Sequence, residues 1–302
     1  MSLPDDYLTY PRRAYGMDQD LYDWRPESVR PLKVWPGDAA VAAMIVVPIE
    51  HHSLTPTSAP FKHPGAMVTA YPDLRHYTTR DYGNRVGVFR ILDALKASAL
   101  KATFPVNANQ LVRLRPLINA ILADGHEIAA YGLSTDHIHW GGLEREVEAG
   151  WIAEVVALFA AAGLKPRTWM SPARQQSFHT LELIAAAGFD ICLDWEQDDV
   201  PVTMRTAAGP VTAVPLSNEL DDRNLLIDKR QSEDVWARQI LEAVDYLKSG
   251  VDRFGGRAIG FTLTPYVSGQ PFRTHAVRTV MNVLGADAAV WSATASEIAD
   301  VP

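Results

Sequence analysis

A carboxylate and two imidazoles follow one another at Glu50-His51-His52, directly after an uncharged run that begins at Val41. A carboxylate or an imidazole can serve as a general base or bind a metal ion. The run before them is rich in Val, Ile, Ala and Met, which is typical of a strand buried on both faces. Because side chains alternate along a strand, Glu50 and His52 are expected on one side and His51 on the other. The three residues mark either a reactive strand end or simply the point where a core strand reaches water.

The rest of the chain alternates between β-prone and helical segments. Apolar residues recur at helical spacing in 86–100, 143–162 and 232–254, and β-prone runs such as 101–106 and 258–264 lie between such segments. About seven strand–helix units form one series without a repeat or a linker. The sequence therefore predicts an α/β fold, a single distorted (β/α) barrel with about seven strands. Its functional side chains are expected at the carboxyl ends of the strands.

Composition narrows the classes of partner. The chain has 302 residues, with 28 Lys and Arg against 36 Asp and Glu, a net charge of −8 that disfavours nucleic acid and anionic membrane surfaces. The single cysteine, Cys192, lies in an apolar run and is expected to be a structural thiol of a reducing compartment. No apolar run is long enough to span a membrane, and the first residues do not resemble a signal peptide. We therefore expect a cytoplasmic protein whose partner is a small-molecule or carbohydrate substrate.

Two stretches lack regular periodicity. Residues 1–36 are rich in proline and aromatic residues, and we expect an extended arm that packs on the barrel of residues 37–302 or on a neighbouring subunit. The apolar surface of such an arm predicts a homo-oligomer, most simply a dimer or a tetramer. The stretch 53–79 contains four prolines and is expected to be a long loop of the kind that forms lids or binding sites.

Several short motifs occur in a fixed order between residues 40 and 300. They are Ile49-Glu50-His51, Arg80-Asp81-Tyr82-Gly83-Asn84-Arg85-Val86-Gly87-Val88, Lys101-Ala-Thr-Phe104, Gly125-His126-Glu127-Ile128-Ala129, Trp169 with Ser171-Pro172, Asp198-Asp199 before Pro201, Val214-Pro215, and Pro265-Tyr266. In this order they resemble the polysaccharide deacetylase (NodB-like) family, in the branch of cofactor-independent allantoinases and peptidoglycan-deacetylase-like proteins. The resemblance implies a distorted barrel of about seven strands that hydrolyses non-peptide C–N bonds. The bond would be the N-acetyl amide of a carbohydrate or part of a ureide such as allantoin.

The sequence departs from the metal-dependent members of that family at three motifs. Those members read T-F-D-D after the first strand, H-G-x-S-H after the third, and L-H-P near the C-terminus. Glu50 stands at the position of a ligand in the first motif, and no carboxylate replaces the catalytic base beside it. Tyr131 and Thr135 replace the two metal-binding histidines, and Thr264 replaces the histidine that acts as the general acid. These departures predict a protein without a tightly bound metal.

Other residues could rebuild a zinc site. Zinc catalysis requires about three nitrogen or oxygen ligands and one open position. Glu50 and His52 share a strand face, and His137 and His139 follow the third predicted strand. If a metal binds, these four residues are its expected ligands. Otherwise they are polar residues that line a cleft.

A metal-free hydrolase needs a base with a raised pKa and a donor for the developing oxyanion. We expect Glu50 to be the base, with its pKa raised by a nearby Asp198 or Asp199, and Tyr131 to be a donor. The expected catalytic residues are therefore Glu50, Tyr131 and Asp199. Trp169 and Trp195 are either flat walls of the substrate pocket or core packing. The residues expected to bind substrate are His51, Asn107, Trp169, Arg174, Trp195, Asp198, Thr264 and Tyr266.

Two functions remain open from the sequence. An enzyme of this kind would bring Glu50, Tyr131, Trp169, Asp199 and Thr264 together in one pocket at the carboxyl ends of the strands. The alternative is a catalytically silent relative that binds a carbohydrate or a small metabolite, which the loss of the family histidines favours. The retained Glu50, Trp169 and Asp198-Asp199 favour the enzyme.

Overall fold

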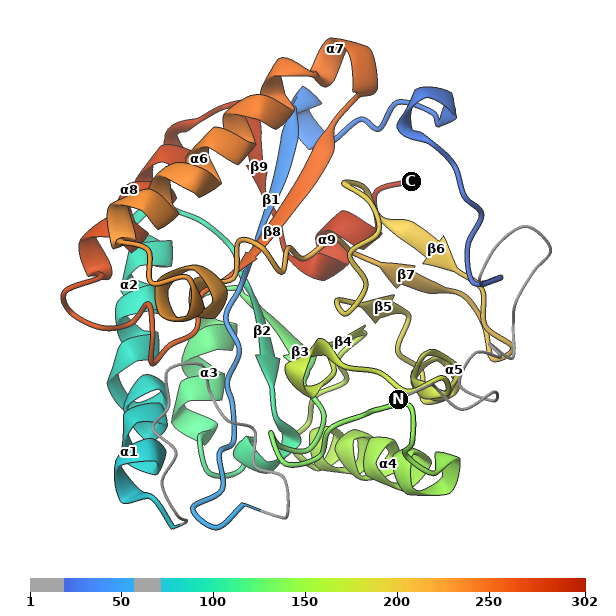
Figure 1. Ribbon diagram of the computed structural model, residues 1–302, viewed down its shortest axis with the longest axis vertical. Coiled ribbons are helices and arrows are strands. Elements are labelled where there is room, and N and C mark those ends of the chain that lie inside the picture. Colours follow the sequence, from blue (N-terminus) through green and yellow to red (C-terminus); the bar gives the residue numbers. More distant parts are fainter. Residues whose placement is uncertain (1–18, 57–71) are drawn as a thin grey trace, which may run out of the picture.

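A curled, mostly parallel sheet forms the frame of the protein, and helices cover its outer side (Figure 1). The computed structural model describes residues 19–56 and 72–302. Within these ranges the sheet order is β6-β7-β5-β4-β3-β2-β1-β8, and β9 pairs with β1. The strands are β1 (Val41–Val46), β2 (Thr103–Val106), β3 (Glu127–Ala130), β4 (Thr168–Trp169), β5 (Ile191–Cys192), β6 (Val202–Met204), β7 (Val211–Ala213), β8 (Arg257–Thr262) and β9 (Val290–Ser292).

The strand pairing confirms the predicted barrel. Neighbouring strands from β7 through β5, β4, β3, β2 and β1 to β8 are parallel, which gives seven parallel strands along the curl. β6 is the exception: it forms an antiparallel hairpin with β7, as the Gly209-Pro210 turn indicates. All six residues of β1 are buried, which agrees with an uncharged central strand.

The two edges of the curl meet without forming a regular ladder. The amide of Ser217 donates to the carbonyl of Gly260 at 2.9 Å, and the amide of Ala258 donates to the carbonyl of Asp199 at 2.7 Å. A Cβ atom on Gly260 would lie 2.5 Å from the carbonyl oxygen of Pro215, so this approach requires glycine. The barrel is therefore closed by single hydrogen bonds between β8 and the segments that flank β6 and β7.

The helices follow the predicted series with shifted boundaries. Helix α1 begins inside the expected 53–79 loop, because the Asp73 carboxylate accepts hydrogen bonds from the amides of Arg75 and His76 at 3.1 Å. Residues 57–71 of that loop lie outside the described residues. The helices are α1 (Leu74–Tyr82), α2 (Val88–Ala97), α3 (Arg115–Ala123), α4 (Arg145–Ala161), α5 (Thr180–Ala186), α6 (Glu233–Ser249), α7 (Val251–Phe254), α8 (Thr274–Ala286) and α9 (Ala295–Ala299).

Alternation along the strands divides the core into two parts. Ile45, Phe104 and Trp169 belong to the larger part, whereas Met44 and Tyr131 belong to the smaller one. Neighbours in sequence such as Met44 and Ile45 belong to different parts, because successive strand residues point to opposite faces. The face on which a strand residue lies therefore decides whether it can reach the inside of the barrel.

Part of the predicted arm is described and lies against the barrel. Trp35 is fully buried, and its indole nitrogen donates to the carbonyl of Arg257 at 2.9 Å. Lys33 forms a parallel bridge with Gly255, and Leu21 is buried. Residues 1–18 of the arm lie outside the described residues. Within the described ranges, no helix combines the length and apolarity needed to cross a bilayer.

Candidate active site

The carboxylate of Glu50 lies buried beyond the carboxyl end of β1. Ile49 bridges to Val106, which extends the pairing of β1 with β2 past the last regular residue and fixes the direction of Glu50. The hydroxyl of Tyr131 donates to Glu50 Oε1 at 3.3 Å, and Arg223 Nη1 donates to the same oxygen at 3.1 Å. The second oxygen, Oε2, lies 3.3 Å from His52 Nε2. A phenol, a guanidinium and an imidazole thus surround one carboxylate.

Two π-helical segments deliver side chains to Glu50. Asn84 belongs to the segment Gly83–Gly87 and donates from Nδ2 to the main-chain carbonyl of Glu50 at 2.9 Å. Arg223 begins the segment Arg223–Asp228 and pairs with the Glu50 carboxylate. Short π-helical turns occur frequently at functional sites. One segment therefore fixes the main chain of Glu50, and the other neutralises its side chain.

The glycines of the first π-helical segment allow close packing beside the site. A Cβ atom on Gly83 would lie 2.6 Å from the amide nitrogen of Tyr266, and one on Gly87 would lie 2.1 Å from the carbonyl oxygen of Pro265. Both glycines belong to the motif that runs from Arg80 to Val88. That motif therefore brings the chain around Tyr266 against the segment that carries Asn84.

The charges at the site are set by burial and by one another. Burial alone would lower the pKa of Arg223, but the Glu50 and Asp221 carboxylates raise it well above its usual range. Burial also raises the pKa of the Tyr131 and Tyr266 phenols, and the charge of Glu50 acts in the same direction. Arg223 is therefore a permanent cation, and both tyrosines remain protonated hydrogen-bond donors.

Asn107 and Thr135 hold the chain that carries the histidines. Asn107 is fully buried; its Oδ1 accepts from the His51 amide at 2.7 Å, and its Nδ2 donates to the Tyr131 carbonyl. Thr135 Oγ1 donates to the His51 carbonyl at 2.8 Å. Burial, followed by the nearby His52, lowers the pKa of His51. Asn107, predicted to bind substrate, is thus placed where it positions His51 and Tyr131.

Thr264 and Tyr266 also come close to Glu50. The Thr264 amide donates to Oδ2 of Asp222 at 2.7 Å, and Asp222 directly precedes Arg223 in the chain. The Tyr266 ring meets His52 edge to face, with ring centres 6.1 Å apart. Burial and the neighbouring Asp221 raise the pKa of Asp222 to about 7. The structure therefore brings Tyr131 and Tyr266 near Glu50, and it places Thr264 beside Asp222, the residue that precedes Arg223.

Asp198 and Asp199 lie at the other end of the barrel. Asp198 pairs with Arg30, and the Asp199 carbonyl accepts from Ala258. Ala258 pairs with Ala42 near the beginning of β1, whereas Glu50 follows the end of that strand. The expectation that Asp198 or Asp199 crowds Glu50 is therefore wrong. Burial and Asp198 raise the pKa of Asp199, but far from the Glu50 carboxylate.

Trp169 does not reach the inside of the barrel. Its ring is fully buried, and the centre of the ring lies 5.1 Å from that of Phe189 and 5.7 Å from that of His139. Its indole nitrogen donates to Ser171 Oγ at 2.9 Å. This is the core-packing alternative, and the expected convergence of Trp169 with Glu50 is wrong. Arg174 is likewise engaged, since it donates to the Leu216 carbonyl at 2.6 Å.

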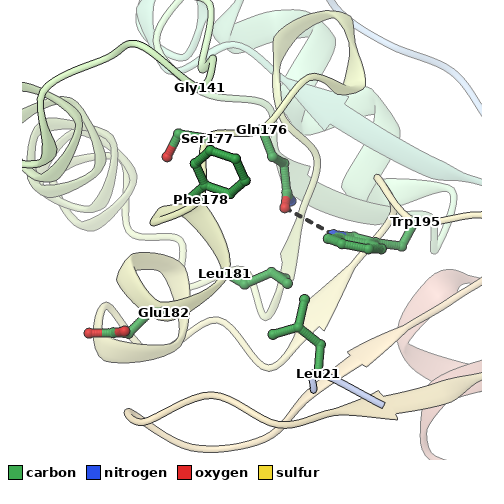
Figure 2. A pocket seen from close by; sticks show the side chains of 8 residues that line it. All are labelled: Leu21, Gly141, Gln176, Ser177, Phe178, Leu181, Glu182 and Trp195. Carbon is green, nitrogen blue, oxygen red and sulfur yellow. Dashed lines mark hydrogen bonds between the residues drawn. The ribbon is translucent and has the colours of Figure 1, made fainter. Parts of the chain in front are cut away.

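Trp195 lies in a separate pocket. Figure 2 shows Trp195 on one side of this pocket and Phe178 on the other, with Leu21 and Leu181 also in its lining. Its indole nitrogen donates to Gln176 Oε1 at 2.9 Å, which is the dashed line in the figure. The described residues that contact the Glu50 carboxylate, Tyr131, Arg223 and His52, are not part of its lining.

The four suggested metal ligands do not converge. His139 Nδ1 lies 2.8 Å from Glu148 Oε1 in the core, and His137 Nδ1 lies 2.7 Å from Ser134 Oγ. Of the four, Glu50 and His52 contact each other, at 3.3 Å. In residues 19–56 and 72–302, no group of three His, Cys, Asp or Glu side chains is arranged to hold a metal ion. The Arg223 guanidinium already places a positive charge at Glu50, so the side chains at the family's ligand positions do not fit a divalent metal.

A small cleft opens beside Glu50. Sequence reasoning missed two residues here: Arg223, which pairs with Glu50 and belongs to no motif, and Gln110, which lines the cleft. Asn84 could have been found, because it lies in the block from Arg80 to Val88. The cleft is lined by Glu50, His52, Tyr77, Arg80, Asp81, Asn84, Gln110 and Arg113.

Known proteins share this architecture. The sequence model of the polysaccharide deacetylase family matches residues 71–192. A probable polysaccharide deacetylase from Pseudomonas aeruginosa PAO1 superposes with a TM-score of 0.81 at 22% identity, over 96% of this chain and 97% of the other. The Puue allantoinase superposes with a TM-score of 0.77 at 22% identity, over 96% of both chains. No curated protein matches the sequence. At these identities the superpositions establish the fold.

Proposed function

We propose that this chain, whose residues 71–192 match the polysaccharide deacetylase family, hydrolyses a non-peptide C–N bond with Glu50 as the reacting carboxylate. The bond would belong to a ureide, such as the substrate of the similar allantoinase, or to an N-acetyl amide of a carbohydrate. The observation that carries the proposal is the environment of Glu50, a buried carboxylate contacted by Arg223, Tyr131 and His52 beside a cleft. Strongly perturbed titratable groups in a cleft are typical of active sites.

The arrangement suits attack by water on a carbonyl carbon. Glu50 takes a proton from the water as the new C–O bond forms, and the carbonyl electrons move to its oxygen. Arg223 and Tyr131 both donate to Glu50 Oε1, so they can donate to the developing oxyanion as Glu50 loses its charge. When the C–N bond breaks, protonated Glu50 returns its proton to the leaving nitrogen. No step in this sequence requires a group from outside the chain.

Binding without turnover is the second candidate function. It is favoured by the ion pair between Arg223 and Glu50, because the guanidinium at 3.1 Å occupies an oxygen on which a catalytic base would receive the proton of water. The absence of a histidine at Thr264, where the family resemblance places the general acid, points the same way. A ligand that binds but is not hydrolysed would support this function.

Activity assays with and without zinc or chelator separate the two functions. The substrates to test are allantoin, N-acetylglucosamine and its oligomers, and small acyl amides. Replacing Glu50→Gln should lower kcat/KM by about 10²–10⁴-fold, the usual contribution of general acid–base catalysis. The matched control is Asp245→Asn on the outer helix α6, which should leave activity unchanged. Full activity of Glu50→Gln would refute the proposed role of Glu50.

We also infer that the chain forms a homo-oligomer through the described part of its arm. Trp24, Val29, Leu32 and Val34 are all largely exposed on this short segment, and exposed apolar clusters of this kind mark interaction surfaces. Light scattering at micromolar concentration should report a dimer or tetramer, and replacing Trp24 and Val34 by serine should shift it toward the monomer. A cytoplasmic location and the absence of a nucleic-acid partner stay predictions.

A further inference from the structure

The side chain of Gln110 is buried in the wall of the Glu50 cleft with an unmet polar atom. Gln110 is 2% exposed, and its Oε1 has no hydrogen-bond partner among the described residues. The same side chain lines the cleft together with Glu50 and Asn84. Buried polar atoms are nearly always paired in folded proteins, so an unpaired one in a cleft calls for an explanation. A ligand that pairs with Gln110 would supply it.

The backbone of Gln110 is fixed to the same frame as Glu50. The short 3₁₀ helix Ala108–Gln110 follows β2, and the Gln110 amide donates to the Asn107 carbonyl at 2.9 Å. The Leu114 amide donates to the Gln110 carbonyl at 2.8 Å. Asn107 in turn holds His51 and Tyr131. The carboxamide of Gln110 therefore projects from a rigid support, at a position set by the residues that also set the Glu50 site.

We propose that Gln110 is the residue that recognises the substrate, by pairing its carboxamide with an adjacent C=O and N–H of the bound molecule. This inference rests on the proposed function and names the group that selects among its substrates. A primary carboxamide offers an acceptor and a donor in one plane. It forms two parallel hydrogen bonds only with an amide whose C=O and N–H lie on the same side, which is the cis form.

This geometry discriminates between the two substrate classes. An open-chain secondary amide, such as the N-acetyl group of a sugar, is trans and adopts the cis form only at high energetic cost. A small ring fixes its amide or ureide in the cis form. Gln110 therefore selects ring amides and ring ureides over N-acetyl sugars.

The test compares Gln110→Met with Gln176→Met. Gln176 is a matched control in the pocket of Figure 2, because its carboxamide donates to Asp194 Oδ2 at 2.6 Å and accepts from Trp195 at 2.9 Å. Removing it breaks bonds, so Gln176→Met should lower the midpoint of urea unfolding. Gln110→Met should leave that midpoint unchanged or raise it, since it removes an unpaired atom.

Binding and turnover of hydantoin and allantoin complete the test. Calorimetry should show that Gln110→Met weakens binding of both rings at least tenfold, while Gln176→Met does not. Gln110→Glu, which keeps an acceptor and loses the donor, should bind with intermediate affinity. For any ring that the protein hydrolyses, Gln110→Met should raise KM by a similar factor and change kcat less.

The outcomes separate this inference from the proposed function. Hydrolysis of a ring ureide with equal KM in the parent and in Gln110→Met would overturn the role of Gln110 and leave the hydrolase intact. Hydrolysis of N-acetylglucosamine alone would do the same. Ring binding that depends on Gln110 but is followed by no turnover would support the inference and overturn the hydrolase. If neither ring binds the parent, the inference is wrong.

Discussion

The Glu50 cleft is smaller than the Trp195 pocket, yet the unpaired polar atom and the buried ion pair lie at the cleft. In the pocket, Gln176 is bound to Asp194 and Trp195, and Glu182 pairs with Arg145 at 2.9 Å. In the cleft, Gln110 Oε1 has no described partner and a fixed cation stands beside Glu50. A buried ion pair and an unpaired polar atom, rather than empty space, therefore distinguish the proposed active site from the pocket.

The largest expected effect concerns the ion pair that distinguishes the cleft. The side chains of Arg223 and Glu50 are only 15% and 5% exposed, and removing one partner of a buried pair costs about 3–5 kcal/mol. Arg223→Ala should lower the free energy of unfolding by that amount in urea titrations. Arg145→Ala at the pocket should cost less than about 1 kcal/mol, because that pair is 41% and 35% exposed. Equal losses in the two variants would contradict the comparison.

Zinc binding tests a second consequence of the Arg223 charge beside Glu50. Placing histidines by Tyr131→His and Thr135→His restores the donors that the family resemblance assigns to the metal, but Arg223 remains 3.1 Å from Glu50. The double variant purified with zinc should therefore contain far less than one equivalent. Adding Arg223→Ala should raise the content toward one equivalent, because the competing charge is gone. Near-stoichiometric zinc in the parent or in the double variant, measured by elemental analysis, would show that Arg223 does not compete.

The buried carboxyl behind the cleft should make stability depend on pH. The pKa of Asp222 is raised to about 7, from about 3.9 for an exposed aspartate. The folded state therefore binds the proton more tightly than the unfolded state. The resulting stabilisation is complete below about pH 4 and is lost as the pH rises toward 7, an effect of a few kcal/mol at most. Asp222→Asn should flatten this decline in thermal melts between pH 4 and 8, and a decline as steep as that of the parent would contradict the assignment to Asp222.

The smallest expected effect concerns the carboxylates at the far end of the barrel. Asp199 lies beside Ala258 and its pKa is raised, yet it does not approach Glu50. Asp199→Asn should therefore leave kcat/KM unchanged, even though the family resemblance covers this residue. A loss comparable to that of Glu50→Gln would mean that the amino-terminal end of the barrel takes part in the reaction.

The barrel could be predicted because its signals are local. Each buried strand is an apolar run of limited length, and each helix carries its own periodicity, so the order of elements follows from the sequence. The positions of Glu50, Tyr131, Thr264 and Tyr266 could be predicted for the same reason, since each follows a strand. The contact of Asn84 with Glu50 requires the helix predicted over 86–100 to begin earlier in the chain. Local sequence patterns define such helix boundaries poorly.

The residues that were misplaced depend on long-range contacts. Trp169 pairs with Ala130 in the sheet, so it shares the face of Ala130 and turns away from Tyr131. The sequence of either strand alone does not determine that register. Asp198 and Asp199 follow β5 as Glu50 follows β1, but the chain there crosses to the beginning of β8 and to Arg30. Arg223 reaches Glu50 from 173 residues away, with no motif around it.

The two π-helical segments make the geometry at Glu50 sensitive to the insertion or deletion of a single residue. Each holds a turn that is wider than that of an α-helix, and removing one residue would return it to the α-helical repeat. A change of one residue rotates the parts of a helix on either side of it by about 100° relative to each other. The deletion of a single codon could therefore turn Asn84 or Arg223 away from Glu50 while every strand keeps its register. Descendants of this barrel can gain or lose the chemistry of Glu50 by insertion and deletion, without substituting any residue that contacts it.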